Sequence, residues 1–198
     1  MRFALVGLTL LAQAAAAQLP AGLEPRTRQV LEQLVDSAKS AGLPTAPLTA
    51  KVAEGKLKQA SDEQIVIAVR GLVRRFGEIR GSLGPSLDET SMTAAATAMS
   101  AGVSLSSIKG LLEAAGSSRA DFATALVTIT DLVVQRVQPV AAVNAVQDLL
   151  ARRAPADQYT RLRADVANDI GAGREPDQSI RSRTDAIIKS LPGRPPDS

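Results

Sequence analysis

Apolar residues recur at steps of three and four along the chain after residue 18, a spacing that places them on one face of an α-helix. The clearest case lies between Ser61 and Arg80 and indicates a central, buried helix. Its apolar face consists of Ile65, Val69, Leu72, Phe76 and Ile79, and Val66, Ile67 and Val73 widen it. No stretch alternates as a β-strand does. We therefore expect an all-α protein of about eight or nine short helices in antiparallel hairpins, arranged as a compact bundle or as a short α-solenoid-like stack.

Glycine and proline residues delimit these helices. Ser61 with Gln64, and Ser86 with Glu89, each form a capping-box pattern at a helix start. The plainest linker is "GSLGP" (81–85), which makes 25–80 and 86–191 candidate sub-bundles of one all-helical domain at 25–191. Residues 18–24 are expected to be a linker and 192–198 a disordered tail. Helices are expected at about 25–41, 44–55, 61–80, 86–101, 104–115, 119–135, 138–153, 157–171 and 176–190.

One kind of joint between helices recurs along the chain. It is present in "SAGLPTAPL" (40–48), "SAGVSLSSI" (100–108) and "GAGREPDQSI" (171–180), with a version lacking glycine in "QRVQPVAAV" (135–143). Glycine takes the left-handed turn after a helix end, and Ser or Pro then starts the next helix. The last three joints lie about 35 residues apart, which is typical of a helix-hairpin repeat. The alternative is that short loops between helices simply share the same residues.

Three of these segments carry a resemblance to a group of known sequences. They are "GLPTAPLTAKVAEGKLK" (42–58), "AGVSLSSIKGLL" (101–112) and "ADVANDIGAG" (164–173). The chain resembles uncharacterised signal-peptide-bearing, all-helical proteins that bacteria secrete or keep in the periplasm. The resemblance implies a helical, exported protein and implies no activity.

The first 17 residues, "MRFALVGLTLLAQAAAA", have the pattern of a cleavable signal peptide. Arg2 precedes an apolar run at 3–11, and a small-residue cleavage site ends before Gln18. The alternative, an uncleaved anchor, needs about 20 apolar residues, and Gln13 interrupts this shorter run. We expect an exported protein, periplasmic or secreted, with no membrane span.

The residue types that are missing narrow the chemistry. The chain has no His, no Cys and no Trp, which removes the commonest general base, the commonest transition-metal ligand and thiol chemistry. Without Cys it forms no disulfide and carries no lipid on a cysteine. We expect no cofactor and no metal. The net charge of +3 comes from interspersed charges, so no nucleic-acid-binding surface is indicated.

Two candidate catalytic patterns have simpler interpretations. Ser106 and Lys109 form an S-x-x-K string, but helical spacing places both on the polar face, where Lys109 is expected to pair with Glu113. Asp165 and Asp169 lie one turn apart and suggest acid–base work or a metal. Because Arg161 lies one turn earlier, we interpret them as a surface row of charges.

The densest basic patch, Arg70, Arg74 and Arg75, is the candidate contact for an anion or a partner. The leading hypothesis is a non-enzymatic, exported interaction or structural module with an unidentified protein partner, which a helix face contacts through Leu, Val, Ile and Arg. The second is an all-α exported enzyme that uses Arg, Lys and carboxylates alone. The third is a weak binder of anions or lipid heads through the three arginines.

Overall fold

The computed structural model describes residues 19–191, with only the backbone of Arg119. The expected signal peptide at 1–17 and the tail at 192–198 lie outside these residues. Within them the chain forms nine α-helices and no strand, which confirms the all-α prediction. The helices are α1 (Pro25–Ser40), α2 (Ala46–Leu57), α3 (Asp62–Leu83), α4 (Glu89–Ser100), α5 (Leu105–Ala115), α6 (Arg119–Val134), α7 (Pro139–Ala151), α8 (Ala156–Gly171) and α9 (Pro176–Ser190).

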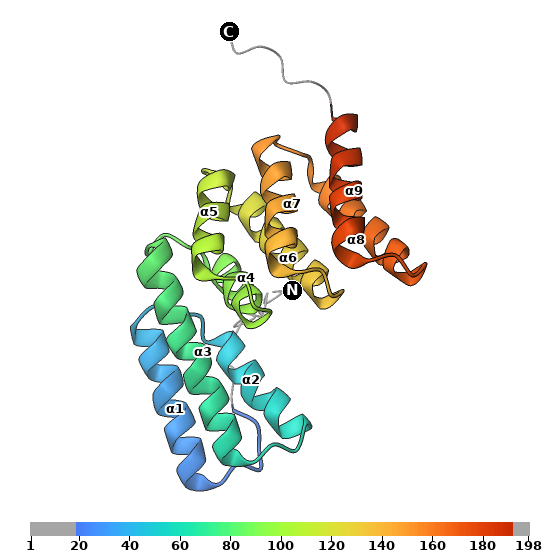
Figure 1. Ribbon diagram of the computed structural model, residues 1–198. Helices are drawn as coiled ribbons and strands as arrows, with labels where there is room; N and C mark the ends of the chain where they lie inside the picture. The colour runs from blue at the N-terminus through green and yellow to red at the C-terminus, as the bar shows by residue number, and fades with distance from the viewer. Residues whose placement is uncertain (1–18, 192–198) are drawn as a thin grey trace, which may run out of the picture.

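The helices follow one another in a curved stack, from α1, α2 and α3 at one end to α8 and α9 at the other (Figure 1). The main contacts join helices that are one or two positions apart in the chain: α3 packs on α1, α2, α4 and α5, and α6 packs on α4, α5, α7 and α8. A single cluster of buried apolar side chains runs from Leu31 in α1 to Ile187 in α9. The division into sub-bundles at 25–80 and 86–191 stays a prediction. No helix in residues 19–191 is both long and apolar enough to cross a bilayer.

The helix that the apolar pattern placed at 61–80 is α3, and its predicted buried face is largely correct. Ser61 and Gln64 form the expected capping box, in which each backbone N–H donates to the other side chain. Ile67 is wrong as part of the apolar face, because 61% of it is exposed. Ile65, Val69, Phe76 and Ile79 are buried, while Leu72 is half-buried.

Two expected features between α3 and α4 are wrong. The linker at 81–85 begins three residues late, because Leu83 packs against the core and keeps the chain helical up to Gly84, where φ is +90°. The N-cap of α4 is Asp88 rather than Ser86. Its carboxylate accepts a hydrogen bond from the backbone N–H of Ser91 at 2.8 Å, while Leu87 is buried just before it. The hydrogen bond from Ser91 holds the pKa of Asp88 below its usual value.

The recurrent joints share one backbone geometry. Gly42, Gly102 and Gly173 have φ of +66°, +98° and +84°, and Arg136 adopts +72° without being glycine. In each, the residue after the left-handed one donates its backbone N–H to a carbonyl five residues earlier, the Schellman arrangement that satisfies a helix end. The pairs are Leu43 with Ala38, Val103 with Ala98, Val137 with Leu132, and Arg174 with Asp169, at 2.8–3.1 Å.

Aspartates in the first turn of α3 and of α9 bind the start of the helix two positions earlier. Asp62 accepts a hydrogen bond from the backbone N–H of Glu24 at 2.9 Å, and Asp177 accepts one from that of Gln138 at 2.8 Å. The first bond lowers the pKa of Asp62. The same contact therefore fixes the start of α1 against α3 and of α7 against α9.

Gly55 marks the closest approach of α2 to α3. A Cβ atom at this position would lie 2.6 Å from Cγ1 of the buried Ile65, whereas a Cβ at Gly77 in α3 would have no neighbour within 4 Å. We expect Gly55→Ala to lower the free energy of unfolding by about 1–3 kcal/mol through overpacking. Gly77→Ala should raise it by about 0.5–1 kcal/mol because alanine favours the helix. Urea denaturation followed by circular dichroism measures both changes, and equal effects at the two sites would contradict the close approach.

Candidate binding groove

A groove of about 1010 Å³ lies on the inner side of the stack, between α2, α3, α4 and α6. Each of these four helices contributes residues from one of its faces, so the groove exists only in the assembled stack. Leu72 of α3 and Val127 of α6 supply its larger apolar side chains, and the buried Phe76 of α3 lies beneath the groove surface. Val127 is 46% exposed, and among the described residues it is one of few large apolar side chains left so open.

Small side chains form much of the groove surface. On α4 they are Thr90, Thr93, Ala94 and Thr97, which recur at steps of three and four and so share one face. The opposite face of α4, which includes Met92 and Ala95, is buried in the core. Ala46 and Ala50 of α2 line the groove across from α4. The groove is therefore mainly apolar and is wide because its side chains are short.

Three of the five hydroxyl groups that line the groove, all but those of Thr90 and Thr93, donate hydrogen bonds within the protein. Thr97 donates to the carbonyl of Thr93 at 2.9 Å, and Ser100 donates to that of Ala96 at 2.8 Å. Thr130 of α6 donates to the carbonyl of Leu126 at 2.8 Å. These hydroxyls offer a ligand only their remaining lone pairs.

Most of the charged side chains of the groove also make contacts within the protein. Lys51 and Lys58 each lie 2.5 Å from Glu54, and their hydrogen bonds, that of Lys51 first, lower the pKa of Glu54 to about 2. Arg163 of α8 binds Asp131 of α6. The groove is therefore bordered by ionised groups at neutral pH.

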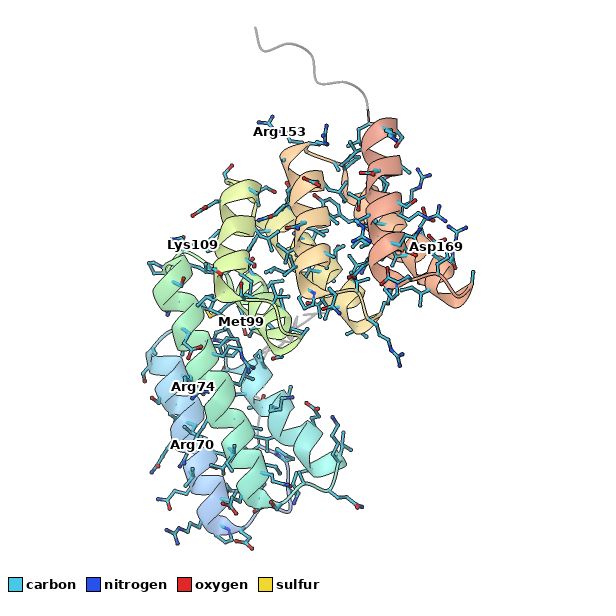
Figure 2. All side chains as sticks on the ribbon, in the orientation of Figure 1. Arg70, Arg74, Met99, Lys109, Arg153 and Asp169 are labelled. Atoms are coloured by element: carbon cyan, nitrogen blue, oxygen red, sulfur yellow. The ribbon has the colours of Figure 1, made fainter. Side chains whose placement is uncertain are left out.

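The three arginines proposed from the sequence do not converge. Arg75 lines the groove and donates to the Ser100 hydroxyl at 2.8 Å. Arg74 is highly exposed, and its nitrogen lies 3.7 Å from the Glu78 carboxylate. Arg70 is exposed one turn before Arg74 on α3, and both are labelled in Figure 2. Only Arg75 belongs to the groove.

The Asp165–Asp169 pair is only partly the expected surface row. Asp165 pairs with Arg161 at 3.6 Å, as expected. Asp169 is buried, with 4% of the residue exposed, so the prediction is wrong there. Its carboxylate accepts two hydrogen bonds from Arg183 of α9, at 2.8 and 2.6 Å, and lies 3.2 Å from Arg174. The bonds from Arg183 lower the pKa of Asp169. The carboxylate thus joins α8 to α9 (Figure 2).

The S-x-x-K string lies on the outside of α5, as expected. Ser106 and Lys109 are both exposed, and the Ser106 hydroxyl shares a hydrogen bond with that of the N-cap Ser104 at 2.9 Å. The expected ion pair between Lys109 and Glu113 is not formed in the part of the chain that the structure describes. Nothing in this geometry would activate Ser106 as a nucleophile.

Two smaller cavities lie elsewhere in the stack. One, of about 700 Å³, lies between the α5–α6 and α7–α8 joints and is lined by Tyr159, whose pKa burial and then Asp121 raise to about 12. The other, of about 480 Å³, lies between α7 and α9. Over residues 19–191 no group of three or more acidic side chains is arranged to hold a metal ion.

Sequence reasoning missed the groove. Much of its surface consists of Thr and Ala, residues that carry no recognisable motif, and it assembles only when α2, α3, α4 and α6 come together. The exposed valine at 127 is the one local signal, since it falls on the polar side of the α6 pattern. Compared with known proteins, the chain matches no family model, no curated protein and no solved structure.

Proposed function

We propose that this chain is an exported, non-enzymatic interaction module that holds a protein partner in the groove between α2, α3, α4 and α6. The observation that carries the proposal is a large, mainly apolar concavity that holds the half-exposed Val127. Apolar surface left open in a concave site is typical of a binding surface. The partner meets Ala, Thr, Val and Leu side chains rather than an arginine patch.

Two features favour binding over catalysis in this groove. The side chains of Lys51 and Glu54 remain 39% and 41% exposed and bind each other. A site that uses lysine or carboxylates as acid or base needs such groups desolvated and aimed at a substrate. Because Arg75 lies in the groove while Arg70 and Arg74 are exposed one turn apart on α3, the three arginines do not gather at one site, which favours this module over an anion or lipid-head binder.

Photo-crosslinking from single positions tests the proposed function. A photoreactive amino acid replaces Val127 in the groove or, as a matched control, Val140 of α7, which is 71% exposed and lies outside the groove. In the envelope of its own cells, we expect the full chain to give defined protein adducts from position 127 and none of these from 140. Absence of adducts at 127, or the same adducts from both positions, would contradict the proposal.

A further inference from the structure

The internal hydrogen bonds of the groove limit what it can hold. An extended peptide brings an unpaired N–H and C=O at every residue, and burying them without partners is costly. Among the residues that line the groove there is no Asn or Gln, and the Thr97, Ser100 and Thr130 hydroxyl protons are already donated to their own helices. Among the described lining residues only the Thr90 and Thr93 hydroxyls make no such bond, which is too few partners for an extended backbone, so an occupant that satisfies its own backbone is favoured.

The spacing of the small side chains matches a helix. Thr90, Thr93, Ala94 and Thr97 form a shallow ridge along α4, and Ala46 and Ala50 leave space opposite. Ridges of this spacing interdigitate with those of a second helix, and short side chains let the two axes come close. Val127 supplies an exposed apolar contact in the same concavity.

The two walls of the groove differ in charge. Among its described lining residues, the α2–α3 wall carries two cations, Lys51 and Arg75, against one carboxylate, Glu54. The α4–α6 wall carries two carboxylates, Glu89 and Asp131, and no cation. Arg163 reaches Asp131 from α8 and offsets part of that charge. The walls are thus complementary to an occupant with an acidic edge on one side and a basic edge on the other.

We propose that the groove binds an amphipathic helix of a partner protein, with its apolar face on α4 and Val127, its acidic edge along α2–α3 and its basic edge along α4–α6. This inference rests on the proposed function and specifies the partner.

Designed peptides of about 20 residues test the proposal, since that length can form a helix. The probe has a leucine face that contains one Trp, with Glu along one edge and Lys along the other. Because the chain itself has no Trp, the peptide emission reports binding directly. We expect a blue shift and saturable binding. A scrambled peptide of the same composition, which has no apolar face, should bind at least roughly tenfold more weakly.

Matched variants of the full chain locate the binding. Val127→Glu should weaken the mixed-edge peptide by roughly tenfold or more, whereas Val140→Glu on the neighbouring helix should leave it unchanged. Glu89→Lys makes the α4–α6 wall less acidic, so it should shift preference toward a peptide with two acidic edges. Absence of that shift would contradict the proposed position of the basic edge along α4–α6.

Several results would overturn the inference. The first is no binding at about millimolar peptide, and the second is equal binding of the scrambled peptide. The third is an equal loss of affinity in both valine variants. The fourth is that palmitate displaces the bound peptide at a lower concentration than an excess of the same peptide does. A chain that sediments as a dimer and becomes monomeric on Val127→Glu would assign the groove to a second copy. If position 127 still gives protein adducts in these cases, the proposed function stands and only the helical partner is wrong.

Discussion

Phe76→Ala in α3 is expected to cost about 3–5 kcal/mol of unfolding free energy, the largest loss among the substitutions considered for this chain. Phe76 is completely buried. It belongs to α3, which packs on α1, α2, α4 and α5, and it lies beside the groove that residues of α2, α4 and α6 border, so several helices surround it. Truncation to alanine removes the favourable transfer free energy of the ring. It also leaves a cavity, because the surrounding helices cannot all move inward to fill it.

The control for this prediction lies on the same helix. Ile67→Ala removes an apolar side chain that is 61% exposed, so the change should stay within about 0.5 kcal/mol. Urea denaturation of both variants at neutral pH gives the two free energies, with the slope of the transition checked for a constant value. Losses of similar size would mean that α3 does not bury the face containing Phe76.

The position of α3 was predictable because its apolar residues follow helical spacing without interruption. Ile65, Val69, Phe76 and Ile79 needed only that period, and their burial confirms it. The prediction for Ile67 is wrong because spacing alone does not show how wide a face of α3 the neighbouring helices cover. The end of α3 at Leu83 also depends on tertiary packing. Gly81 would end the helix in isolation, but the contact of Leu83 with the core keeps the chain helical past it.

The joints show how much local sequence can specify. Gly42, Gly102 and Gly173 occupy left-handed positions as predicted, and their hydrogen bonds close each helix end. The groove could not be predicted in this way. It depends on which faces of α2, α4 and α6 the stack turns inward, and Thr and Ala on α4 are compatible with burial or exposure alike.

The burial of Asp169 could be inferred from local sequence, whereas its contact with Arg183 depends on tertiary packing. In the Schellman joints the third residue from the helix end is the apolar Ala38, Ala98 or Leu132, whose partner five residues later is also apolar. In α8 that pair is Asp169 with Arg174. Aligning the joints therefore indicates that position 169 is buried, whereas the charge row with Arg161 suggested the surface. The contact with Arg183 required the fold, because α9 must return along α8.

Asp169→Ala is the second large effect expected, and it is tested against Asp165→Ala one turn earlier. Removing Asp169 leaves Arg183 without its two hydrogen bonds beside the α8–α9 interface, so the midpoint of thermal unfolding should fall by roughly 5–10 °C. Asp165 pairs with the exposed Arg161 and reaches Arg183 only through a charge interaction without a hydrogen bond, so its loss should change the midpoint by at most about 2 °C. If the two aspartates give equal shifts, the α8–α9 contact does not depend on the buried carboxylate.

The contribution of the Asp169–Arg183 contact to stability should depend on pH. Because Arg183 lowers the pKa of Asp169 below its ordinary value of 3.8, the ionised carboxylate stabilises the folded state above about pH 4. That stabilisation is lost as the pH falls through the folded-state pKa, where Asp169 takes up its proton. The stability difference between the natural chain and Asp169→Asn should thus be constant near neutral pH and shrink in acid. Denaturation curves at several pH values measure it, and a difference that persists unchanged in strong acid would mean that the charge of Asp169 contributes nothing to holding α8 on α9.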